Sequence, residues 1–126
     1  MGYGRSVQDE LREPARRLHA MIPAVYQGFT QLHNAALAPG ALDSGTKELI
    51  ALAIAVSRGC DGCIASHARG AALKDVTAEQ VADAIGVAIL MNGGPATVDG
   101  PRALAAFQEF RARRSGDTEP AVPHTH

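Results

Sequence analysis

The chain has 126 residues, of which 46% are apolar and 20% charged, the composition of a soluble globular protein with one hydrophobic core. Its 12 Lys and Arg nearly balance its 13 Asp and Glu, so the charge pattern excludes a strongly basic surface for nucleic acid or an anionic membrane. Trp is absent and aromatic residues are few, so aliphatic side chains have to build the core.

The start of the sequence and its apolar segments indicate where the protein works. Residues 1–14 contain no apolar run, so we expect no secretory signal peptide. No stretch approaches the roughly 20 apolar residues that a transmembrane helix needs. We therefore expect a cytoplasmic protein, in which a single pair of cysteines is more often catalytic or metal-binding than a structural disulfide.

The apolar pattern predicts helices along nearly the whole chain and no strands. A first helix is expected over residues 7–19, interrupted or restarted at Pro14, because proline lacks the N–H that a helix interior uses. A second helix restarts after Pro23. Its apolar residues form one stripe: Val25, Phe29, Leu32 and Ala36.

The later helices have clearer signals at their ends. The third helix starts after a cap at Asp43 or Ser44, is apolar on all sides, and ends at Gly59. That pattern is typical of a helix in the middle of a bundle. Thr77 and Gln80 then form a capping box at the start of the fifth helix. Between these lies a fourth helix, from about residue 60 to 73, and the last helix ends near residue 113.

The sequence GCDGCIASHARG contains both cysteines of the chain, Cys60 and Cys63, together with His67. On a helix these three positions share one face. Cysteines three residues apart on a helix have the Cα separation that a disulfide requires, and the first helical turn stabilises a thiolate. This arrangement suits peroxide reduction or thiol–disulfide exchange.

Glu48 stands at the start of the apolar third helix, where we expect its carboxyl group to be partly buried. Such a group can accept and return protons near neutral pH. Most carboxylates in a first helical turn are simply solvated groups that favour the helix dipole, and only the spacing to Cys60 argues otherwise here. Periodicity alone does not show that Glu48 meets His67.

Other interpretations of these residues stay open. Cys60 and Cys63 could be buried, unreactive thiols. Together with His67 and Glu48 they could instead bind zinc, although structural zinc sites favour small, loop-rich folds. We expect His33, on the second helix, to be an ordinary core or surface histidine, with a place in the lining of the site as the alternative.

Residues 47–85 resemble the AhpD-like alkylhydroperoxidases of the carboxymuconolactone decarboxylase family. The family pattern is Glu, eleven residues, Cys-x-x-Cys, three residues, His. It is matched here by Glu48, Cys60, Cys63 and His67. The resemblance extends over about residues 22–110. A lone Cys-x-x-Cys would be weak evidence, whereas the same pair with Glu and His at both offsets is specific.

The resemblance implies an all-α, AhpD-like helical bundle of about six helices, whose subunits assemble as homotrimers or homohexamers. It implies a single domain at residues 22–113. An N-terminal helical segment at residues 1–21 precedes it, and a polar tail at residues 114–126, expected to be disordered, follows it.

The resemblance also implies a thiol-dependent hydroperoxide reductase. Cys63 attacks the peroxide, Cys60 then closes the disulfide, and His67 and Glu48 relay protons. Position at the helix start alone would instead make Cys60 the more acidic and more exposed thiol. We expect no bound cofactor, because the chain has no Gly-rich nucleotide loop. An external dithiol, which in relatives can be a lipoyl group on a partner, has to reduce the pair.

The two residues between the cysteines depart from some members of the family. Those relatives carry His or Tyr before the second cysteine, where this chain has Gly62, and Asp61 adds a negative charge that opposes thiolate formation. The alternatives are therefore a general thiol–disulfide oxidoreductase or a non-enzymatic redox sensor. The cysteine pair argues against lactone decarboxylation, which does not depend on it.

Overall fold

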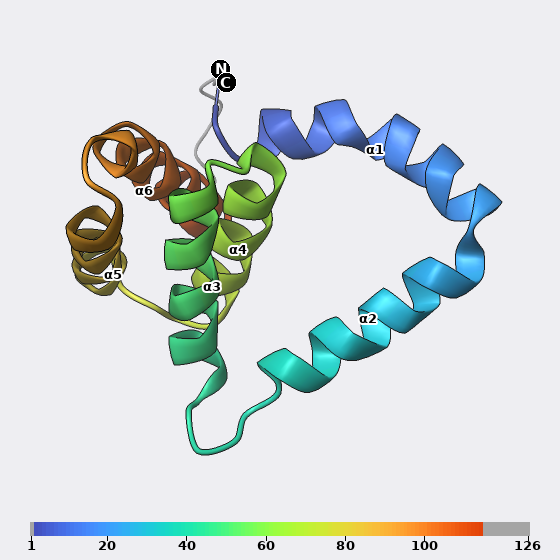
Figure 1. The fold of residues 1–126 in the computed structure, drawn as a ribbon, viewed down its shortest axis with the longest axis horizontal. Coiled ribbons are helices and arrows are strands. Elements are labelled where there is room, and N and C mark those ends of the chain that lie inside the picture. Colours follow the sequence, from blue (N-terminus) through green and yellow to red (C-terminus); the bar gives the residue numbers. More distant parts are fainter. Residues whose placement is uncertain (1, 115–126) are drawn as a thin grey trace.

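A computed structural model of the chain describes residues 2–114, and over this range it contains six helices and no strand (Figure 1). The helices are α1 (Arg5–Met21), α2 (Pro23–Leu37), α3 (Ser44–Arg58), α4 (Asp61–Leu73), α5 (Ala78–Asn92) and α6 (Gly94–Arg114). The all-α prediction is confirmed. Of the predicted tail, Arg114 is the last residue of α6, and residues 115–126 lie outside the described residues.

Helices α3 to α6 form a bundle in which α3 and α6 each pack against both α4 and α5 (Figure 1). The largest fully buried side chains of this core are Phe107, Leu52, Ile64, Val56 and Val81. Each contributes about 1.5–3 kcal/mol of hydrophobic stabilisation. Alanines fill much of the remaining interior, which brings the helix backbones close together.

The predicted helix ends are present. Asp43 caps α3, with its carboxylate accepting a hydrogen bond from the Thr46 N–H at 2.7 Å, which holds the pKa of Asp43 below its ordinary 3.8. Gly59 ends α3 in the left-handed conformation at φ 64°, which an L side chain rarely adopts. Thr77 and Gln80 make both hydrogen bonds of the capping box. These caps fix both ends of α3 and the start of α5.

Helices α1 and α2 form an arm that leaves the bundle and returns to it at α3 (Figure 1). The predicted interruption at Pro14 is wrong, because α1 continues through this residue. All of residues 11–20 are exposed, so water can satisfy the carbonyl group that loses its N–H partner to the proline ring. Pro23 instead occupies the first turn of α2, a position where no N–H is needed.

The apolar stripe on α2 is not buried within the chain. Val25, Phe29 and Leu32 are 64%, 59% and 65% exposed. On α3, Ile50 and Ile54 are 46% and 53% exposed, although Leu52, Ala55 and Val56 of the same helix are buried in the bundle. None of the helices in the described range is long and apolar enough to cross a membrane.

Candidate active site

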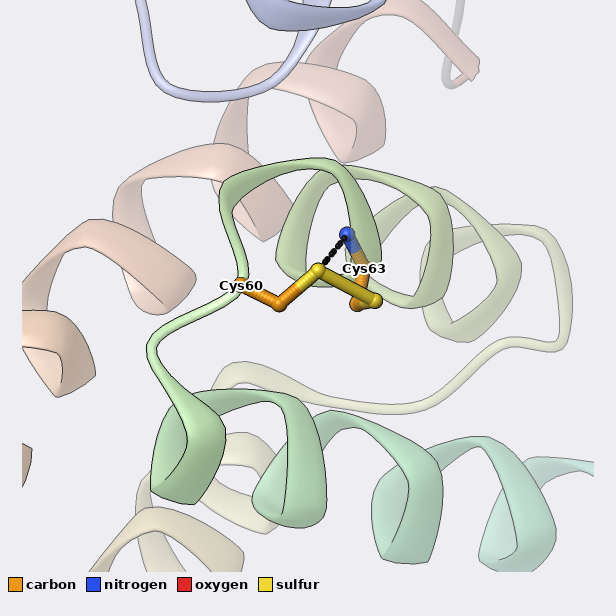
Figure 2. The surroundings of a disulfide bond; sticks show 2 residues. All are labelled: Cys60 and Cys63. Carbon is orange, nitrogen blue, oxygen red and sulfur yellow. Dashed lines mark hydrogen bonds between the residues drawn. A yellow bond between two sulfur atoms is a disulfide. The ribbon is translucent and has the colours of Figure 1, made fainter.

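Cys60 and Cys63 form a disulfide at the start of α4, with their Cα atoms 5.2 Å apart (Figure 2). Cys60 is the capping residue immediately before the helix, and Cys63 lies in the first turn. The Cys63 N–H donates a hydrogen bond to Cys60 Sγ at 3.2 Å, shown as a dashed line in Figure 2. Sulfur here takes the place of the Ser or Asp oxygen that usually caps a helix.

The two cysteines differ in exposure. Cys63 is exposed, whereas Cys60 is half-buried. The expectation from position alone, that Cys60 would be the more exposed sulfur, is therefore wrong. A capping side chain folds back over the first turn to meet its N–H groups, and this covers Cys60. As a whole residue, Cys63 is thus the more accessible of the two cysteines.

Glu48 and His67 meet across the contact between α3 and α4. His67 Nδ1 lies 2.8 Å from Glu48 Oε1, and the two side chains are 20% and 8% exposed. A buried carboxylate needs a partner that replaces its lost hydration, and the imidazole provides one. A carboxylate that accepts a hydrogen bond from Nδ1–H favours the tautomer in which Nε2 is free to accept a proton.

Gly70 makes room for this carboxyl group. A Cβ atom at Gly70 would overlap the Glu48 carboxyl oxygens. Glycine inside a helix lowers the stability of the helix by about 1 kcal/mol relative to alanine. A glycine in the middle of α4 therefore indicates that packing requires it there. Sequence analysis missed this residue, and an isolated glycine one turn after His67 was the signal that could have found it.

His33 of α2 also lies beside the site. Its ring stacks on that of His67, with centroids 6.0 Å apart and planes at 20°. Phe29, one turn earlier, places its ring 6.2 Å from His33. Sequence patterns offered His33 only as the less favoured alternative, because α2 and α4 are separate helices whose packing no local pattern determines.

Asp61 and Gly62 lie between the two cysteines. Asp61 is exposed and belongs to the first turn of α4. Gly62 faces α1, where a Cβ atom would lie 3.2 Å from Leu11 Cδ1.

Within residues 2–114, no group of three or more His, Cys, Asp or Glu side chains is arranged to hold a metal ion.

The sequence model of the carboxymuconolactone decarboxylase family matches residues 23–112. The chain belongs to this family. It is 39% identical over 90 residues to the Cupriavidus necator protein named Uncharacterized protein H16_B0147, covering 71% of this chain and 80% of that one. It is also 40% identical over 87 residues to Uncharacterized protein 4 in cox locus of Paracoccus denitrificans, covering 69% and 78%.

The fold of this family member agrees with a solved structure. The crystal structure of apo-lpg0406, a carboxymuconolactone decarboxylase family protein from Legionella pneumophila, superposes with a TM-score of 0.81. The two chains are 36% identical, and the match covers 85% of this chain and 96% of the other. Both the family resemblance and the all-α fold are confirmed.

Proposed function

We propose that the chain is a thiol-dependent hydroperoxide reductase, working through Cys63 and Cys60 with His67 and Glu48 as its proton relay. The observation that carries this proposal is the 2.8 Å contact between His67 and Glu48. The disulfide lies at the start of α4, the helix that also bears His67. A buried carboxylate on an imidazole suits proton uptake and return. In this proposal the enzyme binds no cofactor and works in the cytoplasm.

Oxidation takes two steps. His67 takes the proton of the Cys63 thiol, and the thiolate attacks one oxygen of the hydroperoxide. An S–O bond forms and the O–O bond breaks, which leaves a sulfenic acid on Cys63 and an alkoxide that takes the proton from His67. Cys60 then attacks the Cys63 sulfur, and the sulfenic hydroxyl leaves as water with the proton of the Cys60 thiol. The exposure of Cys63 supports its role as the attacking sulfur.

An external dithiol of lipoyl type then reduces the pair. Its first thiolate attacks the exposed sulfur of Cys63, and Cys60 leaves as a thiolate. The hydrogen bond from the Cys63 N–H to Cys60 Sγ supports this direction, because a stabilised thiolate is the better leaving group. The second thiol of the donor displaces Cys63, so both cysteines end reduced and the donor ends as a disulfide.

The proposal includes self-association into a homotrimer or homohexamer. Among the large apolar side chains that remain exposed, groups of three lie on α2 and on α5: Val25, Phe29 and Leu32, and Val87, Leu90 and Met91. Monomeric proteins rarely expose so many apolar groups on neighbouring turns of one helix, and a second copy of the chain would cover them.

General thiol–disulfide exchange is a second candidate. It is favoured by Asp61, whose exposed carboxylate beside the cysteines opposes formation of the attacking thiolate and would slow reaction with peroxide. It is also favoured by Gly62, which supplies no proton carrier between the cysteines. Both candidates use the same disulfide and differ in the oxidant that turns over fastest.

The test is a peroxide assay with a dithiol supplied, comparing Cys63→Ser and Cys60→Ser with the unchanged protein. Cys63→Ser should abolish the first oxidation, and Cys60→Ser should let a sulfenic acid accumulate on Cys63, where a sulfenic-specific reagent and mass spectrometry detect it. Ser66→Ala, exposed on the same helix, is the matched control. Undiminished turnover in both cysteine variants would discard the mechanism.

Parallel stopped-flow measurements with small disulfides separate the candidates. Faster oxidation by a disulfide than by any hydroperoxide assigns the protein to thiol–disulfide exchange. Negligible turnover with every oxidant and donor, together with a change of shape or partner on oxidation, indicates a redox sensor instead.

A further inference from the structure

A cavity lies where α1 crosses α4 and α6, and it is lined by none of the residues of the cysteine site. Its volume is about 330 Å³, within the range of small-molecule pockets. Three arginines and one aspartate contribute to its lining, with an apolar wall from α4 and α6: Arg5, Arg12, Arg69, Asp9, Leu73 and Phe110. The reaction proposed for the two cysteines uses none of these residues.

The cavity carries an excess of positive charge. Arg12 is paired with Asp9, with Nη1 2.9 Å from Oδ1, so these two charges offset one another. Arg5 and Arg69 form no ion pair with any residue in the described range. The carboxylate of Glu109 accepts the backbone N–H groups of Gly4 and Arg5 and forms no ion pair with either guanidinium group. Among residues 2–114, the guanidinium groups of Arg5 on α1 and Arg69 on α4 thus have no ion-pair partner.

The remaining wall is apolar. Leu73 is 45% exposed on α4, next to Arg69 at a spacing of four residues, and the ring of Phe110 forms the floor at 8% exposed. A fully hydrated inorganic ion would leave this surface uncovered. A molecule with an anionic group and a short hydrocarbon part would match both features.

We propose that this cavity binds a small amphipathic oxyanion, in which a carboxylate or phosphate pairs with Arg5 and Arg69. A guanidinium group binds either anion through two parallel hydrogen bonds to two of its oxygen atoms. Carboxylates and phosphates therefore fit the same two arginines. The hydrocarbon part lies on Leu73 and Phe110. The proposal does not depend on the thiol chemistry, and its failure leaves that chemistry untouched.

Calorimetric titration of the full chain at low salt tests the proposal with four probes: hexanoate, hexyl phosphate, inorganic phosphate and hexanol. At least one of the first two should bind, and more tightly than either inorganic phosphate or hexanol. The stronger of hexanoate and hexyl phosphate identifies the preferred anionic group. Added salt should weaken the binding, since both guanidinium groups are near the surface.

Substitution then locates the site. Arg69→Gln should weaken binding by about tenfold or more, the effect of losing a hydrogen bond to a charged group. Arg5→Gln is the second variant, should Arg69→Gln not fold, and Arg17→Gln is the matched control. Arg17 is exposed further along α1, near Glu13, and does not line the cavity.

Three results would overturn the proposal. One is no binding of either amphipathic anion at millimolar concentration. Another is equal binding of hexanol, which would show that charge plays no part. The third is unchanged affinity in both Arg69→Gln and Arg5→Gln, which would place the bound anion elsewhere.

Discussion

The carboxyl group of Glu48 fills the space that a Cβ atom would occupy at Gly70. This close approach of α3 to α4 lets the Glu48 carboxylate reach His67 Nδ1 while only 8% of its side chain stays exposed. Glycine therefore positions the Glu48–His67 pair, the relay that we propose, without touching any of the proposed reacting atoms. The relationship predicts that a single methyl group on α4 should disturb proton transfer.

Gly70→Ala should lower peroxide turnover by about tenfold or more, because the added methyl displaces the carboxylate from His67, and acid–base groups contribute 10² to 10⁴ in rate. Steady-state kinetics measures this, with thermal unfolding showing that the variant folds. Gly86→Ala on α5 is the matched control, since nothing lies within 4 Å of its Cβ position. It should gain about 1 kcal/mol of stability at unchanged turnover. Equal turnover in the two variants would contradict the positioning role of Gly70.

The pair itself is tested by a double-mutant cycle. His67→Gln should lose stability of about 1–3 kcal/mol, because it leaves the buried Glu48 carboxylate without its imidazole partner. Adding Glu48→Gln should restore part of this stability, since an uncharged amide is less costly to bury. Denaturant unfolding gives the coupling energy, expected to be about 0.5–3 kcal/mol.

Activity should behave differently from stability in the same variants. Glu48→Gln alone should slow the first oxidation by about 10²-fold, and the double variant should be no faster than His67→Gln. Independent, additive losses would show that Glu48 and His67 do not act as one relay.

The sequence carries most of the local information in this fold. Caps such as Asp43 and the Thr77–Gln80 box act within four residues, so their side chains determine where helices begin whatever the rest of the chain does. The spacing of Cys60 and Cys63 likewise fixes their separation once α4 forms. Gly70 escaped notice because the reason for it lies on another helix.

Features that depend on solvent or on distant packing were harder to predict. Proline usually interrupts a helix, but α1 continues through Pro14 because the residues around it are exposed to water. The stacking of His33 on His67 depends on how the arm returns to the bundle, which no local pattern encodes. The apolar stripe of α2 was visible in sequence, whereas its exposure was not.

The stacking of His33 on His67 predicts that a flat ring is needed at position 33. His33→Phe should keep most of the turnover, and His33→Ala should lose about two- to tenfold, the equivalent of 0.5–1.5 kcal/mol for an aromatic pair. Kinetics across pH distinguishes packing from proton transfer, since Phe cannot titrate. Gln31→Ala, exposed on the same helix, is the control. A rate loss in His33→Phe as large as in His33→Ala would show that the ring face is not what matters.

The exposed stripe of α2 predicts self-association through that helix. Leu32, 65% exposed, lies on the stripe, and Leu32→Arg should shift the protein from a trimer or hexamer to smaller species, because an interface core excludes an unpaired guanidinium. Gln31→Arg adds the same charge on another side of α2, where the residue is also exposed, and should leave assembly unchanged. Sedimentation equilibrium measures both. If the unchanged protein sediments as a monomer, or Leu32→Arg assembles as fully as Gln31→Arg, then α2 is not the contact between copies, and its apolar side chains have to be covered by something else.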